Sequence, residues 1–150
     1  MAEEVNVQIE VRGTSFDSWQ ELSAYRKAYR ESGQHGACAT FVGTMRGENE
    51  GDQVLEMYLE HYPGMTEKQL EEIVDESLRA HELMDVLLLH RMGTVQPGED
   101  IVLVAVWSAH RKEAFAACRE IMEALESKAP FWKKETLRDE DRWVRRNTPE

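Results

Sequence analysis

The pattern of hydrophobic and polar positions predicts three helices and about six strands. Apolar residues recur at helical spacing over residues 15–32 and 110–128 and again after Thr66. Alternating or continuously apolar runs predict strands over residues 5–11, 37–46, 53–62, 85–93, 101–108 and 131–135. Because helices and strands do not alternate regularly, the fold class is α+β with a mainly antiparallel sheet.

Local patterns predict which side chains face the core. The first helix has an apolar stripe of Trp19, Leu22, Tyr25 and Tyr29, and the second has Leu70, Ile73, Val74 and Leu78. Thr66 followed by Gln69 predicts a capping box at the start of the second helix. Alternation over residues 53–62 places Leu55, Met57 and Leu59 on one face of a strand. The third helix must end near Lys128, because Pro130 disfavours helical geometry at Ala129.

Length and composition predict a single domain over residues 1–150. No apolar run reaches the length of a membrane span, and the acidic N-terminal stretch lacks a signal-peptide core. Cys38 and Cys118 are far apart and form no CxxC motif, which favours a reduced, cytoplasmic setting.

Charge is distributed unevenly along the chain. The formal net charge is −11, yet residues 128–146 hold seven basic and four acidic side chains, so this segment is +3 and the remainder −14. An acidic body argues against general nucleic-acid binding, whereas a local basic patch suits a small anion. A solvated tail without a specific role is the alternative that composition favours.

Several kinds of chemistry lack their sequence signals. The five histidines show no metal-ligand spacing, and HExxH is absent. Glycine-rich nucleotide loops and nucleophile elbows are absent as well. We therefore expect no metal and no bound cofactor.

Anion binding is better supported. His110 and Arg111 follow an apolar strand and begin a helix, where backbone N–H groups favour negative charge. Arg46 ends another strand beside glycines. Lys133 alternates with the aromatics of FWKKE, and desolvation makes a lysine amine a better acid, base or nucleophile. The alternatives are ordinary surface charges and, for Lys133, a stem that lies along Phe131 with its ammonium in water.

These positions coincide with motifs of a known family. FVGTMRGEN, LEHYPGMTEKQLEEIVDE, HRMGTVQPGE, SAHRKEAFAACREIM and KAPFWKKE occur in the family's order. With them the chain resembles the large, catalytic subunit of molybdopterin synthase. The resemblance implies an α/β-hammerhead-like fold and a sulfurtransferase that converts cyclic pyranopterin monophosphate into molybdopterin. The sulfur arrives as a thiocarboxylate on the C-terminal Gly-Gly of a small ubiquitin-like carrier. The large subunits form a homodimer, and two carriers complete a heterotetramer.

The resemblance also implies site residues. The family's arginine motif falls on Thr44, Met45 and Arg46, its His-Arg pair on His110 and Arg111, and its second basic motif on Lys133, Lys134 and Glu135. The chain ends in RRNTPE without Gly-Gly, so we do not expect it to be the sulfur carrier itself.

One position departs from the family's pattern. The family usually has a catalytic lysine four residues before the proline, where this chain has Glu126. Lys128 is nearby, but two helical residues rotate a side chain by about 200°. Three explanations are open. The enzyme works with Lys133 as its main amine and Lys128 as a substitute. It is a weak or inactive paralogue that serves as a scaffold for the carrier. Or Glu126 is not the natural residue.

Overall fold

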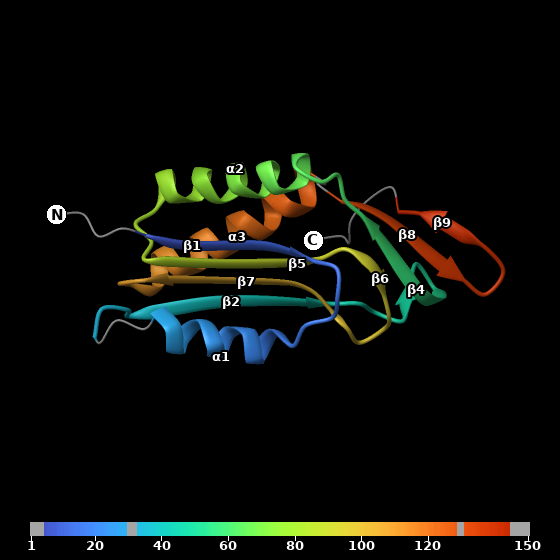
Figure 1. Cartoon of the computed structure of the whole chain (residues 1–150), viewed down its shortest axis with the longest axis horizontal. Helices are drawn as coiled ribbons and strands as arrows, with labels where there is room; N and C mark the ends of the chain where they lie inside the picture. The colour runs from blue at the N-terminus through green and yellow to red at the C-terminus, as the bar shows by residue number, and fades with distance from the viewer. Residues whose placement is uncertain (1–4, 30–32, 129–130, 145–150) are drawn as a thin grey trace.

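A computed structural model of the chain describes residues 5–29, 33–128 and 131–144. These ranges contain three helices and nine strands, and Figure 1 shows how they are arranged. The helices are α1 (Ser18–Tyr29), α2 (Met65–Ala80) and α3 (Arg111–Lys128). The strands are β1 (Asn6–Arg12), β2 (Ala37–Thr44), β3 (Glu48–Asn49), β4 (Asp52–Glu60), β5 (Asp85–Arg91), β6 (Gly93–Val95), β7 (Asp100–Ser108), β8 (Trp132–Leu137) and β9 (Asp141–Trp143).

The predicted α+β class is confirmed, and the strands missed by the sequence pattern are the short ones, β3, β6 and β9. The expected end of α3 near Lys128 is confirmed as well. Ala129 and Pro130, on which that expectation rested, lie outside the described residues.

The first sheet has the strand order β1-β5-β7-β2. β1 pairs with β5 in parallel, from Asn6 opposite Asp85 to Arg12 opposite Arg91, and the other two pairings are antiparallel. Helices α2 and α3 cover one face of this sheet, and α1 covers the other (Figure 1). Every residue of β5 is buried, as expected for a central strand covered on both sides.

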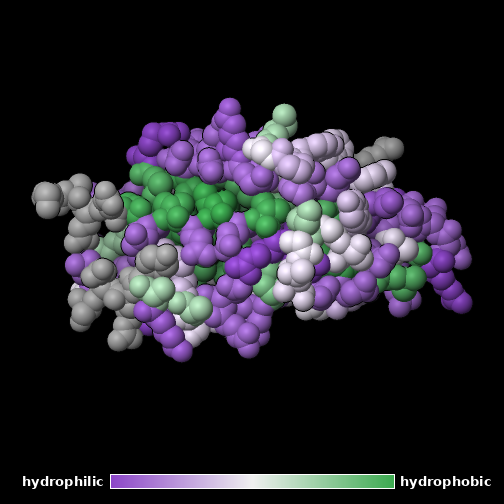
Figure 2. Space-filling view, viewed as in Figure 1, coloured by the Kyte–Doolittle hydropathy of each residue, from purple (hydrophilic) through white to green (hydrophobic). Residues whose placement is uncertain are grey.

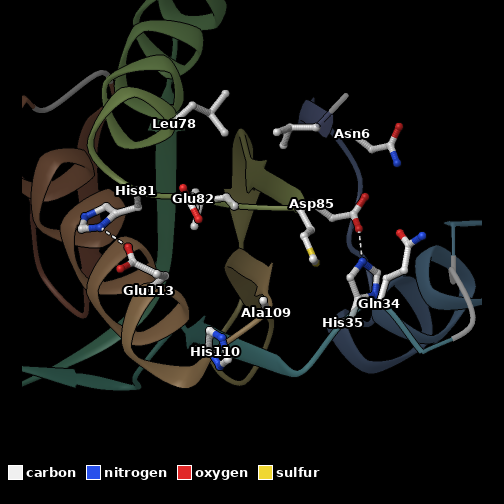
Figure 3. A pocket seen from close by; sticks show the side chains of 13 residues that line it. Asn6, Gln34, His35, Leu78, His81, Glu82, Asp85, Ala109, His110 and Glu113 are labelled. Carbon is white, nitrogen blue, oxygen red and sulfur yellow. Dashed lines mark hydrogen bonds and ion pairs between the residues drawn. The ribbon is translucent and has the colours of Figure 1, made fainter. Parts of the chain in front are cut away.

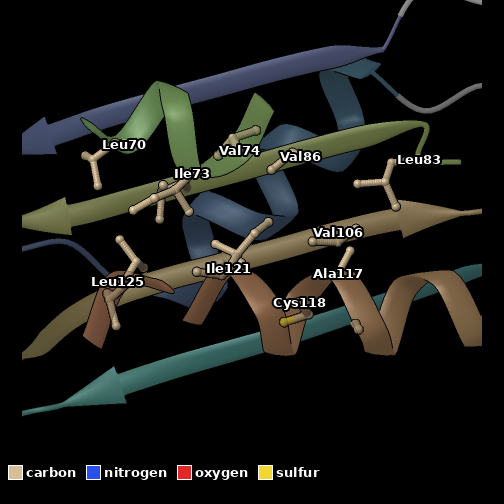
Figure 4. Packing of buried hydrophobic residues seen from close by; sticks show 14 of the residues in the cluster. Leu70, Ile73, Val74, Leu83, Val86, Val106, Ala117, Cys118, Ile121 and Leu125 are labelled. Atoms are coloured by element: carbon tan, nitrogen blue, oxygen red, sulfur yellow. The ribbon is translucent and has the colours of Figure 1, made fainter. Parts of the chain in front are cut away.

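The larger hydrophobic core lies between this sheet and helices α2 and α3 (Figure 4). Leu70, Ile73 and Val74 of α2 are buried in it, and Leu78 packs against it, so the stripe predicted for α2 is confirmed. Burying one such side chain stabilises the fold by about 1.5–3 kcal/mol.

The stripe predicted for α1 is wrong at Trp19, which is 65% exposed. Leu22 and Tyr25 make the contact with the sheet, and the Tyr25 ring stacks on Trp107 with 4.9 Å between centroids. The Tyr29 side chain lies outside the described part. Helical spacing shows which residues share a side of a helix, but not how far along the helix the sheet extends.

The second sheet has the order β3-β4-β8-β9, with β6 also paired to β4. Its interior contains Met45, Val54, Leu59, Val95 and Leu137. The strict alternation predicted for β4 is wrong, because the pairing with β8 shifts between Val54 and Glu56. A bulge there leaves Leu55 44% exposed and Val54 buried.

Two turns differ from the sequence expectation. The polar, glycine-containing composition of residues 47–52 predicts a loop, but the structure has a tight hairpin there, whose central residues Glu50 and Gly51 have φ of 53° and 82°. A two-residue turn with positive φ at both central residues matches the right-handed twist of the two paired strands. Helix α2 begins after Gly64, whose N–H donates to Glu67 Oε2 at 2.8 Å. The N-cap therefore lies two residues before Thr66, and because glycine has no side chain only this half of a capping box forms. Thr66 Oγ1 instead accepts from the Tyr62 N–H at 2.8 Å.

The surface mixes polar and hydrophobic areas. Figure 2 shows a hydrophobic strip over the region between α2 and β1, with polar residues around it. Val7 of β1 is 42% exposed, and Ile9 and Val11 are partly buried against the core. Among the helices of the described residues, none is long and apolar enough to cross a membrane.

Candidate active site

Lys133 lies where the two sheets meet. On one side of β4, Leu59 pairs with Lys133 of β8, and on the other side it pairs with Gly93 of β6. This row of three residues stands close to the point where the chain passes from the first sheet into the second. Phe131, the first described residue after α3, is buried directly before β8.

The two faces of β8 differ in burial. On the inner face Glu135 is buried and Lys133 is half-buried, while on the outer face Lys134 Nζ lies 5.7 Å from the Trp143 ring centroid. The aromatic pair of FWKKE predicts that Phe131 and Trp132 both anchor β8 in the core, but Trp132 is 54% exposed, so the prediction is wrong for Trp132. The reason is strand alternation, which turns Trp132 to the face opposite its buried neighbour Phe131.

Glu135 is held inside the fold. Its carboxylate accepts from Asn49 Nδ2 at 3.0 and 3.1 Å and from Arg142 Nε at 2.9 Å. Arg142 also donates to Asp52 Oδ2 at 2.8 Å and to the Asn49 carbonyl at 3.0 Å. Glu135 is only 3% exposed, and its contacts join β3, β8 and β9. They orient the strand that carries Lys133.

Glu126 and Lys128 both lie in the last turns of α3. The Glu126 side chain is half-buried. Lys128 is exposed, and its Nζ lies 3.3 Å from Glu76 Oε2 on α2. This ion pair directs Lys128 toward α2 and does not favour it as the substitute for the family lysine.

Arg46 follows β2 at the other end of β4. Met45 is buried, while Thr44 and Arg46 are exposed. The Val54 N–H donates to the Gly47 carbonyl at 3.0 Å, which fixes this segment beside the start of β4. Leu59, which pairs with Lys133, lies five residues after Val54 in β4, and this distance is about 17 Å along the strand.

His110 and Arg111 lie at the start of α3, and both are exposed. His110 lines a pocket of about 850 Å³ between β1, α2 and α3 (Figure 3). In that pocket His81 Nδ1 lies 2.8 Å from Glu113 Oε2, and its Nε2 lies 2.7 Å from Glu120 Oε2. These two carboxylates, Glu120 foremost, raise the pKa of His81.

A second contact between a histidine and a carboxylate lies across the same pocket (Figure 3). His35 Nε2 lies 2.5 Å from Asp85 Oδ2, and the Tyr25 hydroxyl donates to Asp85 Oδ1 at 3.1 Å. Within the described ranges, no group of three or more histidine, cysteine or acidic side chains is arranged to hold a metal ion.

One chain does not bring the predicted site residues together. α3 has 18 residues and is about 27 Å long, and it separates His110 and Arg111 from the segment that carries Lys133. Figure 1 shows the start of α3 at one end of the molecule and β8 toward the other. The shared pocket stays a prediction for an assembly of more than one chain.

Sequence reasoning missed His90. This residue of β5 is 7% exposed, and its ring stacks on Phe131 with 3.7 Å between centroids and 10° between planes. A histidine at an inward position of an otherwise apolar strand was the available signal. Its partner is 41 positions away in the sequence, so the contact could not be identified without the fold.

Comparisons with known proteins agree with the resemblance seen in the motifs. The family model described as MoaE protein matches residues 16–128. A curated "Molybdopterin synthase catalytic subunit" from Ralstonia nicotianae is 52% identical over 136 residues, which cover 91% of this chain and 76% of the relative. The crystal structure of molybdopterin synthase from Staphylococcus aureus matches with a TM-score of 0.79 and 31% identity, over 91% of this chain and 96% of that one.

A further solved structure shares the fold at lower identity. It comes from a complex of subunits 1 and 2 of the molybdopterin-converting factor of Helicobacter pylori. It matches with a TM-score of 0.72 and 19% identity, over 94% of this chain and 90% of that one.

Proposed function

The chain belongs to the MoaE family of molybdopterin synthase catalytic subunits, and from this premise we propose how its own residues serve sulfur transfer. The family match and the 52% identical relative carry the assignment as a sulfurtransferase of molybdenum cofactor biosynthesis. The surroundings of Lys133 support a role for this side chain, because a half-buried amine stands there on an ordered strand.

The substrate is cyclic pyranopterin monophosphate, and the partner is a small ubiquitin-like carrier that ends in a Gly-Gly thiocarboxylate. The phosphate requires cations and hydrogen-bond donors, which Arg46, His110, Arg111 and Lys133 supply. Lys133 also contributes an amine that can exchange protons with the reacting groups. The extended carrier tail adds main-chain hydrogen bonds in the groove that it enters. We place this reaction in the cytoplasm.

The active assembly is a homodimer in which two chains complete each pocket. The apolar strands β5 and β7 do not themselves require a dimer partner to cover them, because the chain's own helices cover both. A stronger reason is the length of α3, which keeps Arg111 about 27 Å from the end of the same helix. A twofold axis across α3 would place the start of one α3 beside the end of the other.

The exposed surface along this side of the molecule supports such a contact. β2 is an edge strand whose residues are all uncharged, and Phe41 on it is 42% exposed. Phe115 on α3 is 67% exposed. Light scattering at micromolar concentration checks the assembly, and a mass of one chain would contradict it.

A scaffold without catalytic activity is the second candidate function, and the observation behind it is Glu126 in place of the family lysine. The relatives do not favour the scaffold function, because they are named molybdopterin synthase catalytic subunits. One experiment separates the two. The protein is incubated with thiocarboxylated carrier and cyclic pyranopterin monophosphate, and molybdopterin is assayed. We expect product; carrier binding without product would support the scaffold.

A further inference from the structure

Two connections between the sheets meet at one aromatic contact. In the first, β5 ends at Arg91 and the chain enters β6 at Gly93. In the second, the chain leaves α3 and reaches β8 through Phe131. The rings of His90 and Phe131 lie face to face, 3.7 Å between centroids and 10° between planes, so one contact joins both connections.

This contact lies next to the row that contains Lys133. Gly93 and Lys133 pair with the two sides of Leu59, and each is two or three residues from the stacked rings. Phe131 and Lys133 share a face of the extended segment because alternate residues of a strand point the same way. A displacement of Phe131 would therefore be transmitted directly to the lysine.

The chemistry of His90 suits this position. Its Nδ1 lies 2.8 Å from the Arg91 carbonyl oxygen, and since a carbonyl only accepts, Nδ1 carries the proton. Burial lowers the pKa of His90 to about 4, and the nearby positive charge of Lys133 acts in the same direction. The ring is therefore neutral at physiological pH and lies near an ammonium group without repelling it.

We propose that His90 is a positioning residue for Lys133: its ring fixes Phe131 against β5 and thereby fixes where β8 presents the lysine. This inference rests on the proposed role of Lys133 in sulfur transfer. The competing explanation is a core histidine that contributes stability alone. The two differ in whether loss of the ring changes turnover in molecules that remain folded.

Three variants separate these explanations. His90→Ala removes the ring, and His90→Phe retains a ring that can stack on Phe131. Leu88→Ala is the matched control. Leu88 is fully buried on the same face of β5 as His90, and it is two residues further from Gly93 than His90 is. All three are assayed with thiocarboxylated carrier and precursor below their melting temperatures.

For His90→Ala we expect kcat to fall by at least about tenfold with little change in KM, since small misplacement of a reacting group is costly. His90→Phe should recover most of that loss. Leu88→Ala should lower the melting temperature while keeping kcat. Turnover in His90→Ala equal to that of the original protein, or equal losses in His90→Ala and Leu88→Ala, would overturn the proposal.

A second measurement does not depend on activity. Competitive labelling with acetic anhydride, followed by mass spectrometry, compares the reactivity of Lys133 with that of the exposed Lys27 in each variant. We expect a changed ratio in His90→Ala and the original ratio in His90→Phe and Leu88→Ala. An unchanged ratio in His90→Ala contradicts the positioning role. A changed ratio without any effect of Lys133→Ala on turnover would instead contradict the proposed function.

Discussion

The two sheets of this molecule have interiors of different character. In the first sheet, β5 is buried along its whole length and packs against Leu70, Ile73 and Val74 of α2. In the second, the small apolar interior stands beside a buried carboxylate, Glu135, held by Asn49 and Arg142. The first interior is mainly apolar, with polar contacts such as that of Tyr25 with Asp85 at the end of β5, whereas a buried charged network stands within the second sheet. Directional contacts fix the orientation of a strand, which suits the sheet that carries Lys133.

The largest expected effect concerns Lys133, which the second sheet carries. We expect Lys133→Ala to lower the initial rate of molybdopterin formation by about 10³-fold, or roughly 4 kcal/mol of transition-state stabilisation. Its melting temperature should stay close to the original, because a half-buried amine adds little to packing. Lys27→Ala, on the exposed side of α1, is the control. An unchanged rate in Lys133→Ala would remove this lysine from the mechanism.

The converse change tests the first sheet. Leu103 of β7 is fully buried, and Leu103→Ala should lower the free energy of unfolding by about 2–5 kcal/mol through lost burial and a cavity. Urea denaturation measures this loss. At a temperature where the variant is folded, turnover per molecule should stay near the original value. A large loss of turnover in the folded variant would show that the two sheets do not separate stability from chemistry.

Glu135 tests the polar interior itself. Glu135→Gln keeps the side-chain size but replaces a charged acceptor of the Asn49 and Arg142 contacts, so we expect a loss of about 1–3 kcal/mol in unfolding free energy. Amide hydrogen exchange should increase in β8 and β9 and stay unchanged in β5. Uniformly faster exchange in both sheets would contradict the local role of this network.

A gain of activity is expected from Glu126→Lys. A carboxylate at this half-buried position repels the phosphate of the substrate, whereas a lysine attracts it. One added charge-assisted contact corresponds to about 1.5–3 kcal/mol of anion binding, which should appear as a lower KM. A slower reaction in Glu126→Lys would show that this chain has adapted its site around the carboxylate.

The smallest effect concerns pH and the pocket at the end of α2. Contacts with Glu120 and Glu113 raise the pKa of His81 above its ordinary value of 6.5. Their stabilising contribution is therefore fully present below pH 6.5 and is lost as pH rises through the raised pKa. The melting temperatures of the original protein and His81→Gln should differ most near about pH 6 and converge at alkaline pH. A difference that grows with pH would contradict this assignment.

The sequence predicted the first sheet's elements better than the second's. Continuous apolar runs marked β5 and β7, because a strand buried on both faces needs no alternation. In β4 the bulge beside Val54 turns Leu55 to the opposite face from the predicted one. No residue type in the sequence predicts a bulge of this kind. The local sequence pattern could not predict the parallel pairing of β1 with β5 either, because this pairing joins segments that are distant in the sequence.

For the candidate site, motifs identified Lys133 and the anion-binding residues, but not their arrangement. His110 and Lys133 are separated by the length of α3, and the sequence of one chain does not contain the geometry of an assembly. His90 was missed because its role depends on Phe131, which only the packing of β5 against the start of β8 brings close.

The parallel pairing at the edge of the first sheet also bears on how the chain acquires its structure during synthesis. β1 leaves the ribosome first, yet its partner β5 follows 79 positions later, from Asn6 to Asp85. The other three strands of that sheet lie within residues 37–108 and pair with one another without it. β1 therefore joins a sheet that can assemble in its absence. Until then Val7, Ile9 and Val11 stay exposed on the nascent chain, where a chaperone that recognises extended apolar segments would find them.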